Sequence, residues 1–266
     1  MAGEMGLDGD VNSAPDINRD LWTHINQQHT GADARRAWQQ QGIRWGLFAI
    51  DDDELGALGE VDGLDVAELG CGTAFFSAAL ARAGARPVGV DVTHAQLLTA
   101  QRCQVEFDIF FPLVEADAEH VPLASESFDL VVSEYGASLW CDPELWIAEA
   151  ARLLRAGGRL VFLTNSVLSA LCVPAESGVA SEQLLRAQRE LGRVQWPGGG
   201  VEHHTSHGQW ISILTRNGFV VDALHELYAP VNATAPEYYE IVSAQWARQW
   251  PAEDLWVAHL HRGTES

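Results

Sequence analysis

Residues 66–74 read Val-Ala-Glu-Leu-Gly-Cys-Gly-Thr-Ala, and the rest of the chain is best interpreted from this short segment. An apolar run over residues 64–69 has the length of a buried strand, and Gly70 and Gly72 end it. Apolar residues then recur at helical spacing from Phe75 to Ala83. The pattern predicts a strand, a tight glycine turn and a helix whose first amide groups face a ligand.

Further apolar runs follow this unit and alternate with helical patterns. They cover residues 88–91, 111–114, 128–132 and 160–162. Asp91 closes the first of these runs, 21 residues after Gly70 (91 − 70), where a carboxylate can accept both hydroxyls of a ribose. The alternation predicts an α/β fold with a doubly wound, mainly parallel sheet.

A dinucleotide-binding protein is the main alternative for a glycine turn of this kind. Its fingerprint needs a third glycine at position 75, for close packing of the helix on the strand. This chain has Phe75 there, and small residues at Gly70, Gly72 and Ala74 instead. The spacing therefore favours another nucleoside-containing cofactor over a nicotinamide dinucleotide.

The whole series of motifs resembles the class I S-adenosylmethionine-dependent methyltransferases. The resemblance is good over residues 61–165 and loose in the C-terminal third, and the family commonly has glycine where Ala74 stands. It implies S-adenosyl-L-methionine as the cofactor. It also implies a seven-stranded sheet with a C-terminal antiparallel hairpin and a helical cap. Residues 133–143 look like those of a small-molecule subgroup.

The resemblance places the cofactor at the carboxyl ends of the first four strands. Glu68 would attract the ammonium or sulfonium group, although a structural acid that bonds loop amides is the alternative. Asp91 would bind the ribose, and Asp117 with the Ala118 amide would bind the adenine. The full predicted cofactor set is Glu68, Gly70, Cys71, Gly72, Asp91, Val92, Asp117, Ala118 and Ser133.

The acceptor site is harder to predict, because methyl transfer depends mostly on positioning and desolvation. Amide- and adenine-methylating members carry an Asn/Asp-Pro-Pro-aromatic motif after the fourth strand. This chain has Ser133-Glu134-Tyr135 there, which puts those substrates in doubt. The predicted catalytic residues are His207 and Glu134. The predicted pocket residues are Trp22, Tyr135, Trp140 and His203.

The run His203-His204-Thr205-Ser206-His207 leaves three uses open. A histidine there can act as a general base, three imidazoles can bind a metal, or the histidines can simply bond the helix start. His207 is the predicted base, because it begins the patterned helix. No metal is predicted.

Composition excludes several functions. The formal net charge is −21, which disfavours nucleic-acid and membrane partners. The small-molecule acceptor is what the resemblance implies. All 16 basic residues are arginine, so a lysine Schiff base, a Walker-type loop and a Tyr-Lys dehydrogenase pair are excluded. The four scattered cysteines predict a reducing cytoplasm. A monomer or homodimer is expected.

The remaining segments are assigned by periodicity and turn residues. We expect disorder over residues 1–16 and one domain over 17–266. That domain comprises an N-terminal helical cap (17–60), the cofactor-binding core (61–165), an acceptor-pocket insertion (166–206) and the C-terminal part of the sheet (207–266). Helices are expected over 19–29, 32–41, 181–191 and 236–250, and strands over 219–228 and 255–261. Residues 167–205 lack sheet patterning. The acids at 51–54 predict a solvated face, with the start of a short helix as the alternative.

The sequence therefore predicts a cytoplasmic enzyme that methylates an oxygen or nitrogen atom of a small molecule. The alternative is a protein of the same fold that binds S-adenosylmethionine but performs other chemistry, or an inactive partner subunit.

Overall fold

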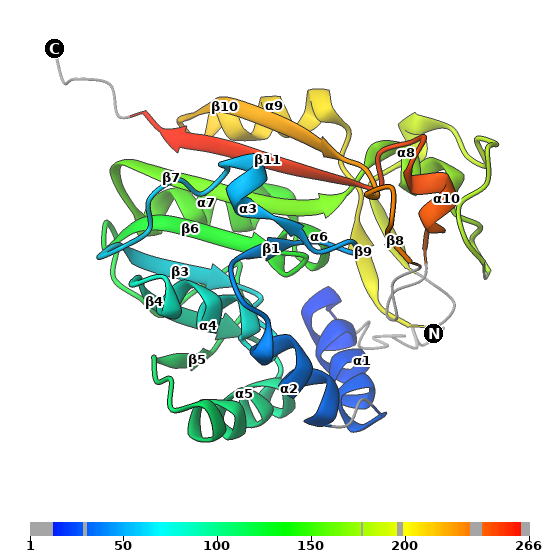
Figure 1. Cartoon of the computed structure of the whole chain (residues 1–266). Helices are drawn as coiled ribbons and strands as arrows, with labels where there is room; N and C mark the ends of the chain where they lie inside the picture. The colour runs from blue at the N-terminus through cyan, green and yellow to red at the C-terminus, as the bar shows by residue number, and fades with distance from the viewer. Residues whose placement is uncertain (1–12, 29–30, 177, 196–198, 235–240, 262–266) are drawn as a thin grey trace, which may run out of the picture.

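The computed structural model describes residues 13–28, 31–176, 178–195, 199–234 and 241–261. Seven strands form the main sheet (Figure 1), in the order β10 (Phe219–Leu227), β11 (Glu253–Leu260), β7 (Leu154–Asn165), β6 (Phe128–Glu134), β3 (Asp65–Leu69), β4 (Arg86–Asp91) and β5 (Leu113–Glu115). Neighbouring strands are parallel, except that β11 runs antiparallel to both β7 and β10. The predicted α/β fold with a C-terminal antiparallel hairpin is confirmed.

Strand β3 lies where the chain changes direction across the sheet. Strands β3, β4 and β5 follow one another outward, and β6 and β7 then add to the opposite side of β3. Glu68 consequently has Gly89 of β4 on one side and Val132 of β6 on the other. Open parallel sheets bind ligands at such a reversal, outside the carboxyl ends of the strands. The glycine turn after β3 is therefore the centre of the site.

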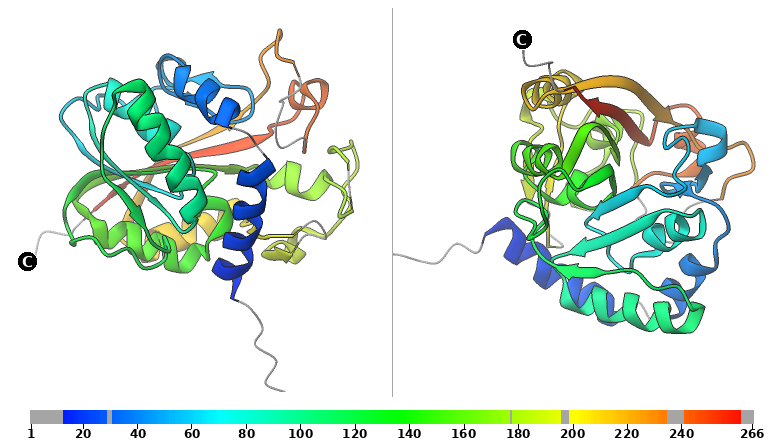
Figure 2. Two further views of the ribbon diagram at one scale, coloured as in Figure 1. Left: turned by 90° about the horizontal axis from the view of Figure 1, so that it is seen from below. Right: turned by 90° about the vertical axis from the view of Figure 1, so that its left-hand side faces the viewer.

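Helices cover both faces of the main sheet (Figure 2). On one face, α7 (Pro143–Leu153) and α9 (His207–Arg216) pack on the largest core, which includes Trp146, Phe162 and Trp210. On the other, α4 (Phe75–Arg82) packs with Trp45 and Leu58, and α5 (His94–Phe107) lies beside α4. We call these the α7 face and the α4 face. Alternate residues of each strand point to opposite faces.

The N-terminal helices are α1 (Ala14–Gln28) and α2 (Gly31–Gln39), and both pack on α5. Helix α1 begins inside the segment 1–16 that was predicted to be disordered. The reason is a local cap, since Ser13 Oγ donates to Asp16 Oδ2 at 2.6 Å and accepts from the Asp16 amide at 3.4 Å. The rest of that prediction, for residues 1–12, lies outside the described part of the chain.

A hairpin of β1 (Arg44–Trp45) and β2 (Ile50–Asp51) connects the N-terminal helices to α3 (Asp52–Leu55). The expectation of a solvated acidic face over 51–54 is wrong for Asp52. Its carboxylate is buried and accepts a hydrogen bond from Trp45 Nε1 at 2.7 Å. This contact attaches the β1–β2 hairpin to the core of the α4 face.

The insertion after β7 differs most from the prediction. It holds α8 (Val167–Cys172), a 3₁₀ turn at Gln188–Glu190, and a second hairpin of β8 (Arg193–Gln195) and β9 (Val201–His203). The helix expected over 181–191 is absent, because Leu184 and Leu185 are exposed and find no core to cover.

The helix expected over 236–250 is reduced to α10 (Ala244–Ala247), and residues 235–240 lie outside the described ranges. No helix in the described residues is both long and apolar enough to span a membrane.

Candidate functional site

The glycine turn after β3 presents open backbone. Gly70 and Gly72 have positive φ angles of 78° and 54°, which glycine adopts without strain. The amides of Gly70 and Cys71 donate to the Val90 carbonyl at 2.8 and 2.9 Å and hold the turn against β4. A Cβ atom placed on Gly72 would meet nothing within 4 Å. A ligand can therefore approach the backbone at Gly72 closely.

Asp91 lies at the end of β4 with its carboxylate beside this turn. Oδ2 accepts from the Gly72 amide and Oδ1 from the Thr93 amide, both at 2.8 Å. Burial raises the pKa of Asp91 above its usual range. The two amide contacts orient the carboxylate and leave further lone pairs for ribose hydroxyls. Val92, the next residue, is half-buried between Asp91 and Thr93.

Glu68 lies beneath the turn on the α4 face and is 2 % exposed. Its Oε2 accepts from the Ser77 amide at 2.9 Å and from the Ser77 hydroxyl, so it fixes the first turn of α4. Burial raises the pKa of Glu68 to about 8. These contacts are those of an acid that shapes the turn, and its predicted contact with the cofactor stays a prediction.

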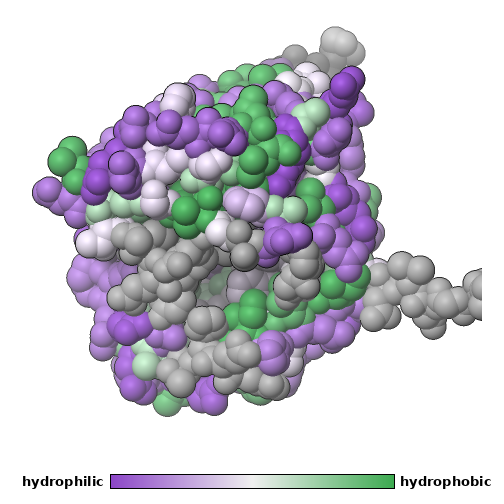
Figure 3. Space-filling view, turned by 90° about the vertical axis from the view of Figure 1, so that its right-hand side faces the viewer, coloured by the Kyte–Doolittle hydropathy of each residue, from purple (hydrophilic) through white to green (hydrophobic). Residues whose placement is uncertain are grey.

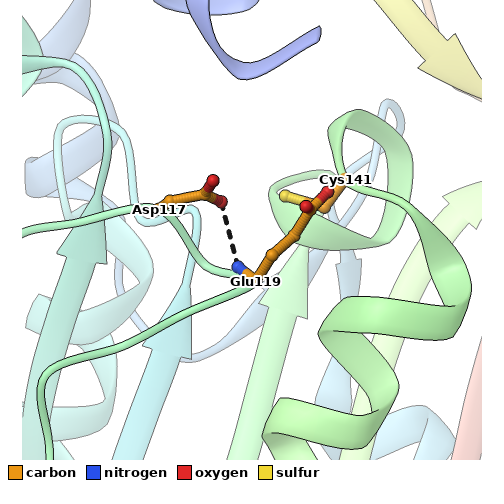
Figure 4. Close-up of side chains that lie close together, drawn as sticks. All are labelled: Asp117, Glu119 and Cys141. Atoms are coloured by element: carbon orange, nitrogen blue, oxygen red, sulfur yellow. Dashed lines mark hydrogen bonds between the residues drawn. The ribbon is translucent and has the colours of Figure 1, made fainter. Parts of the chain in front are cut away.

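Asp117 follows β5, close to Glu119 and Cys141 (Figure 4). Asp117 Oδ1 accepts from the Glu119 amide at 3.0 Å, and Glu119 Oε1 accepts from the Asp142 amide at 2.7 Å. One ligand atom from each of Asp117, Glu119 and Cys141 lies within 4.8 Å of the other two. Burial and the neighbouring acids raise the pKa of the Cys141 thiol well above its usual value.

We assign no metal to this group, because Asp117 is the predicted adenine ligand. Ala118 is 5 % exposed, so only its backbone can take part in binding.

Ser133 requires a correction. It was predicted to contact the cofactor, but its side chain is fully buried. Its Oγ donates to the Leu69 carbonyl at 2.9 Å and accepts from the Ser138 amide at 3.1 Å, so it ties β6 to β3. The error arises because Ser133 points to the α7 face, where α6 (Ala137–Trp140) covers it.

The loop after β6 lies directly against the glycine turn. A Cβ atom on Gly70 would be 2.5 Å from Gly136 Cα, and one on Gly136 would be 2.4 Å from the Gly70 carbonyl oxygen. Both positions must therefore be glycine for the two loops to touch. Tyr135, just before Gly136, has a φ of 54°, an uncommon conformation for an aromatic residue.

Glu134 and Glu253 form a second acidic group on the α4 face. Glu134 Oε1 accepts from the Gly46 amide at 3.2 Å. Glu253 Oε1 accepts from the Leu47 amide at 2.8 Å and from the Tyr135 hydroxyl at 2.7 Å. Burial, followed by the Glu253 charge, raises the pKa of Glu134 to about 8, and burial raises that of Glu253 to about 7.

The sequence analysis missed Glu253. The signal available in the sequence was strand alternation. Glu253 lies two and four residues before Leu255 and Val257, so it points to the same face of the sheet as these core residues.

The predicted pocket residues Trp22, Trp140 and His203 come from three elements that lie together: α1, α6 and β9. The rings of Trp22 and Trp140 meet edge to face with centroids 5.3 Å apart. Asn18 ties the three elements together, because its side-chain amide donates to the carbonyls of Trp140 at 3.1 Å and Val201 at 2.9 Å. Burial lowers the pKa of His203, which therefore favours the neutral form.

His207 lies at the start of α9, on the α7 face. Its Nε2 contacts Asp254 Oδ2 at 2.7 Å, and its ring packs edge to face on Trp256. The hydrogen bond that His207 donates to Asp254 raises the pKa of His207, so the imidazole stays charged to higher pH. A charged imidazole cannot accept a proton. The role of His207 as a base stays a prediction, and this contact weakens it.

The molecule has a hollow on its surface and a separate cavity at another place. The surface seen from the carboxyl ends of the parallel strands is hollowed near its centre (Figure 3). A cavity of about 500 Å³ lies elsewhere, at the amino ends of β4 and β5, lined by residues that include Arg82, Arg86 and Phe111. That cavity contains none of the predicted site residues.

Residues 67–162 match the family model described as a methyltransferase domain. The chain is 32% identical over 121 residues to a demethylmenaquinone methyltransferase of Clavibacter sepedonicus, covering 43% of this chain and 49% of that relative. The chain thus spans about half the length of this curated relative.

Two solved structures share the fold, both with a TM-score of 0.64. One is an S-adenosylmethionine dependent methyltransferase from Mesorhizobium loti, at 24% identity over 80% of this chain and 100% of that one. The other is the [4+2]-cyclase SpnF, at 15% identity over 95% of this chain and 98% of that one.

Proposed function

We propose that the protein transfers a methyl group from S-adenosylmethionine to a small-molecule acceptor, because residues 67–162 match the family model described as a methyltransferase domain. The acceptor atom in this proposal is an oxygen or nitrogen nucleophile. The observation that supports the proposal most is the turn at Gly70–Gly72, whose open backbone lies beside the Asp91 carboxylate. A nucleoside fits there, with its ribose on Asp91 and its adenine toward Asp117 and the Ala118 amide.

The chain's own residues fit this cofactor in charge as well as in shape. S-adenosylmethionine supplies a methyl group activated by a positively charged sulfur. Asp91, Glu68 and Glu134 place carboxyl groups around the turn, and none of the three bonds to an arginine or histidine in the described residues. Burial raises the pKa values of Glu68 and Glu134 to about 8, and a cationic ligand beside them would favour their ionised form.

The acceptor side is proposed to lie between α1, α6 and β9. Trp22 and Trp140 form an aromatic wall there, and His203 is neutral and buried beside it. The relative from Clavibacter sepedonicus is named for demethylmenaquinone, so the proposed acceptors include aromatic rings that carry oxygen substituents. A net charge of −21 supports the further proposals that neither nucleic acid nor an anionic membrane is a partner.

A second function has one observation in its favour. The likeness to a [4+2]-cyclase associates this fold with a reaction that is not methyl transfer. A cofactor-binding protein with other chemistry, or an inactive partner subunit, is therefore the alternative. Only product analysis separates it from the first proposal.

Calorimetry tests the cofactor part of the proposal. S-adenosylhomocysteine should bind, and NAD should not. The Asp91→Ala variant loses charged contacts worth about 1.5–3 kcal/mol, so its affinity should fall roughly tenfold or more. Asp53→Ala, which removes an exposed acid from α3, is the matched control and should bind like the wild type. Binding of NAD without S-adenosylhomocysteine would contradict the proposal.

A further inference from the structure

Tyr135 lies beside the glycine turn, and the hydroxyl of its half-buried side chain bonds to a buried carboxylate. The residue follows β6 directly, and its neighbour Gly136 packs on Gly70 of the glycine turn. Its hydroxyl donates to Glu253 Oε1 at 2.7 Å. The left-handed backbone at Tyr135 is costly for an aromatic residue, which indicates that the surrounding structure requires this placement.

Glu253 reaches Tyr135 from a strand 118 residues further along the chain. It is fully buried, and its second oxygen, Oε2, has no hydrogen-bond partner among the described residues. A Cβ atom on Gly46 would lie 2.0 Å from Glu253 Oε1, so the β1–β2 hairpin closes over this carboxylate only because residue 46 is glycine. The fold therefore accommodates the buried Glu253 carboxyl group but leaves its Oε2 without a hydrogen-bond partner among the described residues.

The surroundings of Glu253 contain neutral donors and other acids. Tyr135 and Leu47 donate to it, and its titratable neighbours are Tyr135, Glu134 and Asp254. Its register partner on β7 is Asn165 and on β10 is Leu227, neither of which ionises. With no cation among these neighbours in the described part of the chain, a proton is what neutralises Glu253. The pKa of about 7 supports this, because a group that titrates near neutral pH exchanges protons readily.

We propose that Tyr135 and Glu253 are the proton-accepting pair of the methyl-transfer site. Tyr135 faces the acceptor, and Glu253 is a positioning residue that acts through Tyr135. The inference rests on the proposed function and narrows it to acceptors with an ionisable hydroxyl group, such as phenols, enols and hydroquinones.

For such an acceptor, the O–H bond breaks. Its proton goes to the Tyr135 oxygen, while the Tyr135 proton goes to Glu253. The electron pair left on the acceptor oxygen forms the bond to the methyl carbon. The sulfur keeps the pair of the carbon–sulfur bond that breaks. Glu253 then returns the proton through Tyr135 to water.

An acceptor-free measurement tests the pair first. In protein labelled with ¹³C at the Cζ of its tyrosines, with S-adenosylhomocysteine present, the Tyr135 signal should shift with a midpoint near pH 7 as Glu253 titrates. Tyr135→Phe assigns the signal. Glu253→Gln should abolish the shift, and Glu226→Gln, an exposed acid on β10, should preserve it. A signal that does not change between pH 5 and 9 would refute the pair.

Turnover tests the role, with 1,4-dihydroxynaphthalene as the acceptor probe. Tyr135→Phe should lower kcat about a hundredfold, the usual contribution of a positioned base. Glu253→Gln should lower it about tenfold and remove the rise in rate through pH 7. The affinity for S-adenosylhomocysteine should stay within about threefold in both variants, and thermal unfolding should show that both fold.

The outcomes separate the two hypotheses. If Glu253→Gln retains full turnover with the probe, the pair is structural, and the inference fails while the proposed function stands. If the wild type binds S-adenosylhomocysteine and methylates amines but not the hydroxyl probe, the proton-accepting role is overturned. If it binds no S-adenosylhomocysteine at all, the proposed function itself fails, whatever the Tyr135 signal shows.

Discussion

Glu253 and Asp254 are consecutive acids on strand β11, so their side chains point to opposite faces of the sheet and meet different partners there. Asp254 points to the α7 face and contacts the partly exposed imidazole of His207 at 2.7 Å. Glu253 points to the α4 face, where its two donors, Tyr135 and Leu47, are both neutral. Both carboxylates are almost completely buried. The difference shows that burial alone does not decide how an acid behaves; the charge of its nearest partner does.

The largest expected effect comes from filling the space that Glu253 occupies. Gly46→Ala places a methyl group against Glu253 Oε1 on a residue with a φ of 69°. The left-handed alanine costs about 1–2 kcal/mol and the clash roughly 1–3 kcal/mol more. The free energy of unfolding, measured by denaturant titration, should fall by that sum.

Gly56→Ala is the matched control, because Gly56 has a similar φ of 64° and nothing within 4 Å of its Cβ position. It should lose only the backbone contribution, about 1–2 kcal/mol. Equal losses in the two variants would show that the Glu253 carboxylate moves aside without cost, and would weaken the case for a fixed pair.

The second largest effect is expected in the pH dependence of stability, which should distinguish Glu253 from Asp254. Burial raises the pKa of Glu253 from 4.5 to about 7, so between these values the folded protein holds a proton that the unfolded chain has lost. This difference makes the folded state less stable as pH rises, by up to about 1.4 kcal/mol per pH unit. Glu253→Gln should therefore become stabilising relative to the wild type from pH 5 to 7 and level off above.

Unfolding midpoints in denaturant at several pH values measure this. Glu68 remains in both proteins, but the Glu253 charge also raises the pKa of Glu134, so the difference between variant and wild type reports Glu253 together with its coupling to Glu134. A constant difference across the range would mean that Glu253 keeps an ordinary pKa and would remove the basis of the comparison.

The smallest effect is expected on the α7 face. The Asp254 hydrogen bond raises the pKa of His207, so its contribution to stability is complete below pH 6.5 and is lost as pH rises through the raised value. NMR titration of the His207 ring should show a pKa above 6.5 that decreases in Asp254→Asn. His207 is 37% exposed, so its contribution to the free energy of unfolding should stay below about 1 kcal/mol. An unshifted His207 would contradict this pairing.

Local patterns in the sequence were sufficient for the cofactor side of the molecule. The strand, glycine turn and helix around Gly70 and Gly72 were predicted correctly, because backbone conformation there depends on residues close in sequence. Asp91 was placed beside the turn for the same reason, since it ends the adjacent parallel strand. The start of helix α9 at His207 was also predicted, from the helical pattern that begins there.

The segments that failed are those whose structure depends on distant contacts. The helix expected over 181–191 has the right local residues, but the fold leaves the side chains of Leu184 and Leu185 exposed. Ser133 was assigned to the cofactor from its position after an apolar run. Only the packing of α6 against β6 shows that its hydroxyl forms hydrogen bonds within the core.

By itself the sequence determined the α/β fold, the turn that opens the backbone at Gly72, and the acid beside it, because hydrogen bonds and backbone angles between near neighbours fix these features. The tertiary structure alone decided which acids meet. Glu253 lies 118 residues from Tyr135 and more than 200 from the hairpin that closes over it, and no local pattern encodes that contact. Strand alternation then places Glu253 and Asp254 on opposite faces. The charge of their partners, which depends only on what packs against each face, gives the two acids different chemistry.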